Sequence, residues 1–158
     1  MNIQRHAGFY VVGIAARTQN SAERNGSGKI GEIWHKLLRD NLASKIPNKI
    51  GINLTAVYTD YEGGLEGHYT YLLGLPVSSI LNVPANFVAK YIPGGRYCVV
   101  TSERGPIRQV VSETWKRICS MPVAELGGIR SFRADYEIYD QRAADAEKAQ
   151  IEVYVGLR

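Results

Sequence analysis

The residues of this chain best suited to chemistry are glutamates and tyrosines that alternate with aliphatic residues towards the end of the sequence. They stand in two runs, Tyr136-Glu137-Ile138-Tyr139 and Ile151-Glu152-Val153-Tyr154-Val155. Residues two apart in a β-strand lie on the same face, so each run would present a carboxylate beside a phenol ring. The carboxylate supplies negative charge, and each ring face adds about 0.5–2 kcal/mol of cation–π attraction. The pattern therefore predicts a site for an organic cation.

The alternation also predicts which side chains pack in the core. If a helix covers one face of the sheet, Ile138 and the triad Ile151, Val153 and Val155 should point towards that helix. The glutamates and tyrosines should then line a groove on the opposite face. A glutamate there without a basic partner would have a raised pKa, because burial disfavours its charged form. The alternative is an open sheet on which the polar residues simply face solvent.

The sequence contains the same segment twice, as residues 10–77 and 91–158, at an offset of 81 and without a gap. Identical pairs at this offset include Tyr10 and Tyr91, Glu32 and Glu113, and Trp34 and Trp115. Two like units packed about a pseudo-twofold axis would create a groove between them, and grooves bind ligands.

The offset extends the candidate site into the first unit. It equates Tyr58 with Tyr139 and Tyr71 with Glu152, so both tyrosines are expected to line the groove. Trp115 is expected to anchor the core, with a position at the border of the groove as the alternative. The candidate ligand-binding residues are therefore Glu137, Glu152, Tyr58, Tyr71, Tyr139, Tyr154 and Trp115.

Hydrophobic periodicity and turn residues predict a similar order of elements in both units. In the first unit, strands are expected over Phe9–Thr18, Asn53–Tyr61 and Tyr69–Val77, with a loop over Gln19–Lys29 and a helix from Ile30 that ends before Pro47. In the second unit, Phe87–Ile92 and Arg96–Glu103 should flank a hairpin turn at Pro93-Gly94-Gly95, and the closing strands should be Tyr136–Asp140 and Ile151–Leu157. Proline tolerates the first position of a helix, so Gly105-Pro106 should start the second helix, whose buried stripe should include Cys119.

These elements predict an α+β fold of two β-α-β-β units related by a pseudo-twofold axis, with antiparallel sheets, one helix on each sheet and a central cleft. The units span approximately residues 7–77 and 86–158, and Ser78–Ala85 links them. At 158 residues the chain fits a single domain, 1–158. A domain of this size buries roughly 70% of its unfolded surface.

The composition argues against several other classes of protein. The net charge of +4 is mild and the basic residues are scattered, without a helix-turn-helix, so no direct DNA binding is expected. No apolar run approaches the length that spans a bilayer, so no membrane partner is expected. Two cysteines without framework spacing favour a reducing, cytoplasmic location. His6, His35 and His68 lack metal-ligand spacing, and Gly26-Ser27-Gly28-Lys29 lacks that of a phosphate-binding loop, so no cofactor is expected.

Several motifs are similar to those of a known family. The two closing strands, the run Tyr71-Leu72-Leu73-Gly74-Leu75-Pro76-Val77, and Ile92-Pro93-Gly94-Gly95-Arg96-Tyr97 followed by Gly105-Pro106 resemble the corresponding parts of the GyrI-like effector-binding superfamily. The resemblance covers essentially the whole chain. Members of the superfamily include effector domains of multidrug-responsive transcription activators, the gyrase inhibitory protein and stand-alone drug-binding proteins encoded on integron cassettes.

The resemblance implies a stand-alone protein, not an enzyme, that binds lipophilic organic cations as a drug sensor or by sequestering the drug. The family's buried acidic residue matches Glu137, and the second carboxylate and the tyrosine of its last strand match Glu152 and Tyr154. Two alternatives stay open: a protein that interacts with gyrase or a transcription regulator, and a hydrolase of cyclopropane-bearing toxins in which Glu137 activates water. Activators of the family carry a separate DNA-binding domain, which a chain that begins at the first strand would lack.

Overall fold

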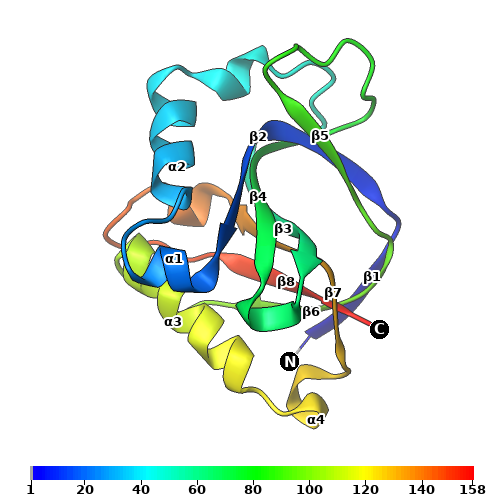
Figure 1. Cartoon of the computed structure of the whole chain (residues 1–158), viewed down its shortest axis with the longest axis vertical. Helices are drawn as coiled ribbons and strands as arrows, with labels where there is room; N and C mark the ends of the chain where they lie inside the picture. The colour runs from blue at the N-terminus through cyan, green and yellow to red at the C-terminus, as the bar shows by residue number, and fades with distance from the viewer. Residues whose placement is uncertain (1) are drawn as a thin grey trace.

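The computed structural model describes residues 2–158, and its central feature is one eight-stranded antiparallel sheet (Figure 1). The strand order is β1-β6-β8-β7-β3-β4-β2-β5. The strands are β1 (Asn2–His6), β2 (Phe9–Gln19), β3 (Leu54–Glu62), β4 (His68–Val77), β5 (Val88–Ile92), β6 (Gly95–Thr101), β7 (Arg130–Tyr139) and β8 (Glu152–Leu157). The helices are α1 (Asn20–Arg24), α2 (Ile30–Arg39), α3 (Ile107–Ser120) and α4 (Val123–Leu126), with short 3-10 helices at Leu42–Lys45, Gly64–Glu66 and Gln141–Ala143. The predicted α+β class is confirmed.

A single sheet joins the two predicted units, in place of the separate sheets expected from the sequence. The join is the pairing of β3 with β7, in which Ala56 lies directly opposite Glu137. Pairing these two strands satisfies backbone groups that two separate sheets would leave exposed at their edges. Ala56 and Glu137 differ by 81 in number, the offset of the repeat. The duplication and its pseudo-twofold axis remain predictions, but the pairing places Glu137 on a central strand of the sheet.

The predicted hairpin at Pro93-Gly94-Gly95 is wrong. β5 pairs with β2, whereas β6 pairs with β1 and β8, so β5 and β6 lie near opposite ends of the strand order. The chain crosses between them because each strand finds its partner elsewhere: β5 covers the free edge of β2, and β1 covers that of β6. The crossing buries Ile92 and Tyr97 in one shared hydrophobic cluster. Turn residues located the reversal but did not determine the pairing.

The two long helices occupy the predicted positions, and α1 lies within the segment expected to be a loop. α2 buries Ile33 and Leu37, and α3 begins directly after Pro106. Cys119, which was expected in the buried stripe of the second helix, is exposed, and so is Leu38 of α2. Each follows a buried residue by one position, which rotates it by about 100° around the helix axis. No helix within residues 2–158 combines the length and the apolar character needed to cross a membrane.

α2 and α3 lie on the same face of the sheet (Figure 1). α2 packs in a cluster with Ala56 of β3, and α3 packs in a cluster with Val153 of β8. Glu137 lies directly opposite both residues, one on each neighbouring strand, and directly opposite residues share a face. The other face has its own core, which includes Val57 and Tyr136. The region between the two helices therefore lies over the central strands β3 and β7.

Candidate functional site

Glu137 is the centre of the candidate site. Its side chain is fully buried. Its Oε2 accepts hydrogen bonds from the Tyr58 hydroxyl at 2.8 Å and from the Trp115 indole Nε1 at 2.6 Å, and its Oε1 accepts one from the Tyr139 hydroxyl at 2.8 Å. All three donors are uncharged, and no ion pair within residues 2–158 includes Glu137. Hydrogen bonds alone stabilise this carboxylate.

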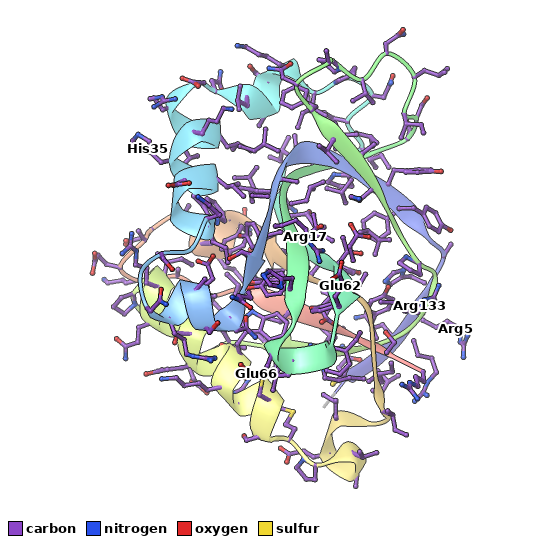
Figure 2. The ribbon with its side chains drawn as sticks, viewed as in Figure 1. Arg5, Arg17, His35, Glu62, Glu66 and Arg133 are labelled. Atoms are coloured by element: carbon purple, nitrogen blue, oxygen red, sulfur yellow. The ribbon has the colours of Figure 1, made fainter. Side chains whose placement is uncertain are left out.

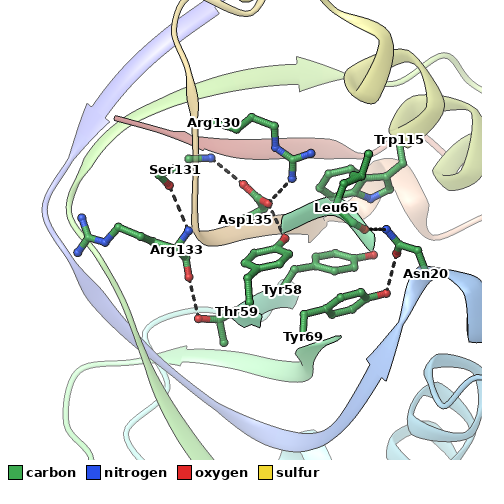
Figure 3. Close-up of polar contacts among 12 residues, drawn as sticks. Asn20, Tyr58, Thr59, Leu65, Tyr69, Trp115, Arg130, Ser131, Arg133 and Asp135 are labelled. Carbon is green, nitrogen blue, oxygen red and sulfur yellow. Dashed lines mark hydrogen bonds and ion pairs between the residues drawn. The ribbon is translucent and has the colours of Figure 1, made fainter. Parts of the chain in front are cut away.

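The three donors come from elements that meet between the helices. Tyr58 lies on β3 and Tyr139 on β7, which are neighbours in the sheet, and Trp115 comes from α3. Tyr139 shares the face of Glu137 because the two residues are two apart in the same strand. The rings of Tyr58 and Trp115 have centroids 5.0 Å apart and are drawn together in Figure 3. The sheet and α3 thus hold the donors in place around one carboxylate.

A second aromatic layer surrounds this group. The Tyr71 hydroxyl accepts a hydrogen bond from Trp34 Nε1 at 2.8 Å, and the Tyr71 ring lies edge-on to Tyr58 at 5.2 Å. Trp34 also contacts the ring of Tyr139, with centroids 4.7 Å apart. Sequence reasoning did not include Trp34 in the site. The repeat was the signal that could have found it, because the offset equates Trp34 with Trp115.

Burial raises the pKa of Glu137, and the hydrogen bonds from Trp115, Tyr139 and Tyr58 only partly oppose this effect. Burial, together with the nearby Glu137 carboxylate, also raises the pKa of Tyr58, Tyr71 and Tyr139 well above the ordinary value for a phenol. The phenols therefore stay protonated and keep their hydrogens to donate. The cluster combines one carboxylate that is costly to ionise with rings that cannot supply a positive charge.

The raised pKa of Glu137 predicts how stability depends on pH. Because glutamates of an unfolded chain titrate near about 4.3, Glu137 favours folding most below that pH. This contribution is lost as the pH rises through the higher pKa of the folded state. Glu137→Gln removes the charge and keeps the shape, so the variant should have the higher thermal midpoint at neutral pH, by a margin that shrinks on acidification. Thermal denaturation of both proteins over a pH series checks this, and a margin that grows on acidification would contradict it.

A second buried carboxylate, Asp135, lies two residues before Glu137 on the same face, but a cation neutralises it. Its Oδ2 forms an ion pair with Arg130 at 2.7 Å and accepts a hydrogen bond from the Tyr61 hydroxyl. Figure 3 shows Arg130 pointing towards Asp135. The Arg130 guanidinium carbon also lies 5.7 Å from the centre of the Trp115 ring. Of these two carboxylates, Glu137 is therefore the one left to interact with a ligand.

Glu152 and Tyr154 do not join the candidate site. In the pairing of β7 with β8, Glu137 lies opposite Val153, whereas Glu152 lies opposite Ile138. Directly opposite residues share a face, so Glu152 and its i+2 neighbour Tyr154 lie on the other side of the sheet from Glu137. The expectation failed because Ile138 was assigned to the helix side, where the structure has Glu137.

Both residues have partners on their own face. Arg142 lies 3.4 Å from the Glu152 carboxylate, and the ring of Tyr154 stacks on Tyr136 with centroids 4.5 Å apart. This face is not the groove expected from the sequence, since the curved sheet buries Tyr136 in a core there. The five other predicted site residues, Glu137, Tyr58, Tyr71, Tyr139 and Trp115, come together on the helix side.

Comparison with solved structures supports the fold. An integron cassette protein from the mobile metagenome of Vibrio cholerae, VCH_CASS2, is 24% identical with a TM-score of 0.78, over 99% of this chain and 95% of that one. SAV2435, solved bound to tetraphenylphosphonium, is 14% identical with a TM-score of 0.79, over 99% of this chain and 93% of that one. At these identities the likeness shows a shared fold.

Comparison of sequences shows the family. YobU of Bacillus subtilis (strain 168), a proposed transcriptional regulator, is 31% identical over 147 residues, which are 92% of this chain and 90% of that protein. The family model described as Cass2, integron-associated effector binding protein, matches residues 2–157. The resemblance to effector-binding proteins of integron cassettes is confirmed, and the chain belongs to the integron-associated effector binding protein family.

Proposed function

We propose that this protein binds lipophilic organic monocations at Glu137, with Tyr58, Tyr71, Tyr139 and Trp115 around the ligand. The observation that supports this most is a fully buried carboxylate that accepts hydrogen bonds from uncharged donors and has no cationic partner within residues 2–158. A charge at low dielectric interacts strongly with an opposite charge brought close to it. A ligand cation would supply the partner that the chain itself does not.

The aromatic side chains account for the lipophilic part of the preference. Rings around a carboxylate bury the apolar groups of a ligand and attract its positive charge through their faces. SAV2435, which shares the fold, was solved with such a lipophilic monocation bound. A lipophilic cation suits both the carboxylate and the aromatic rings of the cluster. An anion of the same shape would be repelled by the negative charge of Glu137.

Binding at Glu137 requires a side chain to move, because the carboxylate is fully buried. The three hydrogen-bond donors to this carboxylate, Tyr58, Trp115 and Tyr139, are all partly exposed, so they are the candidates. A ligand that displaced Trp115 would replace one hydrogen bond of the carboxylate by a direct charge interaction. We propose that this rearrangement near α3 lets the protein act as a sensor of such cations, or lets it sequester them.

A pair of ligands with matched shape tests the proposal. Tetraphenylphosphonium and tetraphenylborate have four phenyl groups around a centre of opposite charge. We expect the cation to bind in the low-micromolar range and the anion to bind at least about 30-fold more weakly, which corresponds to about 2 kcal/mol. Trp34 and Trp115 lie in the cluster, so their fluorescence should report binding. Equal affinities would contradict the proposal, and mass spectrometry of the recovered ligand separates binding from turnover.

A further inference from the structure

A second concave site lies away from Glu137, where β1, the connection from β5 to β6, the start of β7 and the end of β8 meet. It is a cavity of about 510 Å³, a size typical of small-molecule sites. Four arginines line it, Arg5, Arg96, Arg133 and Arg158, together with the hydroxyl-bearing Ser131. Figure 2 shows Arg5 and Arg133 near one another at one margin of the molecule.

The charges of this cavity are not balanced by the protein. No acidic residue lines it, and within residues 2–158 none of the four arginines forms an ion pair. Arg5 lies directly opposite Arg96 in the pairing of β1 with β6. Like charges directly opposite on neighbouring strands destabilise a sheet. An arrangement that costs stability is typical of a functional site.

Arg96 is held in place without being neutralised. Its Nη2 donates a hydrogen bond to the Gly127 carbonyl at 2.7 Å, and its Nη1 donates one to the main-chain oxygen of Arg158 at 3.3 Å. These acceptors fix the orientation of the guanidinium, and neither belongs to an acidic side chain. The Ser131 hydroxyl accepts a hydrogen bond from the Arg133 backbone N–H at 3.3 Å, so its own hydrogen is left to donate. The cavity therefore offers hydrogen-bond donors from Arg96 and Ser131, and the Arg96 guanidinium is held in a fixed orientation.

We propose that this cavity binds an organic phosphate with two or more negative charges, of the size of a nucleoside di- or triphosphate. Guanidinium groups bind phosphate oxygens through paired hydrogen bonds, and several around one cavity suit a polyphosphate chain. The cavity volume suits a small molecule, whereas a nucleic acid duplex would need an extended basic surface. This site would take ligands of the opposite charge from the Glu137 cluster, and the two share no residue.

Calorimetric titration with ATP, inorganic pyrophosphate and adenosine tests the proposal. We expect ATP and pyrophosphate to bind, with affinity that falls as salt is raised, and adenosine to bind undetectably. The basic residues of an edge strand can also serve only to prevent strand association. Lack of binding by both phosphates at concentrations up to about 1 mM would favour that role and overturn the proposal.

Matched variants locate the binding. Arg5→Gln/Arg133→Gln removes two exposed charges from the cavity. It should weaken ATP binding at least about tenfold, which corresponds to about 1.4 kcal/mol. Arg108→Gln removes an exposed arginine on α3, outside the cavity, and should change ATP affinity by less than about twofold. Equal losses in both variants would indicate non-specific attraction and overturn the site. Duplex DNA that bound more tightly than ATP, with the same dependence on Arg5 and Arg133, would overturn the ligand class.

This test is independent of the cation site. Glu137→Gln should leave ATP binding unchanged, and Arg5→Gln/Arg133→Gln should leave tetraphenylphosphonium binding unchanged. The thermal midpoint of each variant without ligand shows that a loss of binding is not a loss of folding. Failure of one site therefore does not decide the other.

Discussion

Glu137→Gln is expected to weaken tetraphenylphosphonium binding at least about 30-fold, because removing one partner of a buried charge pair costs about 2 kcal/mol or more. Glutamine has nearly the shape of glutamate, and its carbonyl can still accept hydrogen bonds from Tyr58 and Trp115. The substitution therefore changes the charge and leaves the aromatic surroundings in place. Tryptophan fluorescence titration of the variant and the parent protein measures the difference.

The same variant carries its own folding control. Because burial raises the pKa of Glu137, the neutral side chain should stabilise the ligand-free protein at neutral pH, so weaker binding would be accompanied by a higher thermal midpoint. A protein that had simply misfolded would lose both. Glu113→Gln, which neutralises an exposed glutamate on α3, is the matched control and should leave the affinity unchanged. If Glu137→Gln itself left the affinity for tetraphenylphosphonium unchanged, that result would contradict cation binding at Glu137.

Glu152→Gln tests whether Glu152 contributes to the cation site, as expected from the sequence, or lies outside that site, as in the structure. Glu152 lies on the opposite face from Glu137 and close to Arg142. We therefore expect tetraphenylphosphonium affinity to change by less than about twofold, since charges well separated and solvated interact weakly. A loss comparable to that of Glu137→Gln would show that both faces contribute to one site.

Arg130→Met is expected to destabilise the protein by about 3–5 kcal/mol, because it leaves the Asp135 carboxylate buried without its cation. The side chain of Asp135 has no exposed surface, and that of Arg130 is 12% exposed. Although burial disfavours the charged guanidinium, Asp135 raises the pKa of Arg130, which keeps Arg130 protonated. Chemical denaturation of the variant and the parent protein at neutral pH measures the loss.

A double variant shows whether the loss comes from the unpaired charge. Asp135 Oδ1 accepts a hydrogen bond from the Gly156 backbone N–H at 2.8 Å, and an asparagine at this position could keep that bond. Arg130→Met/Asp135→Asn should therefore be more stable than Arg130→Met by about 2 kcal/mol, from the relief of the buried charge. A double variant no more stable than the single one would assign the loss to packing of the Arg130 side chain against Phe132 and Trp115.

The sequence by itself determined the local elements and the identity of the central carboxylate. Apolar periodicity located α2 and α3, proline at position 106 marked the start of α3, and alternation located β8 and the end of β7. These features depend on neighbours within one or two turns of chain, so a single sequence contains them. The repeat also brought Tyr58 and Tyr71 into the prediction, and both lie in the aromatic cluster.

The tertiary structure decided which strands pair and which face each side chain occupies. A shift of one residue in register exchanges the two faces of a strand. The assignment of Ile138 to the helix side therefore misplaced Glu137 and Tyr139, which lie on that side in the structure, apart from Glu152 and Tyr154. Register depends on partners far along the chain, such as Ala56 opposite Glu137, and no local pattern encodes them. The ion pair between Arg130 and Asp135 was missed for a related reason, because it lies across a register shift in β7 that the sequence pattern does not mark.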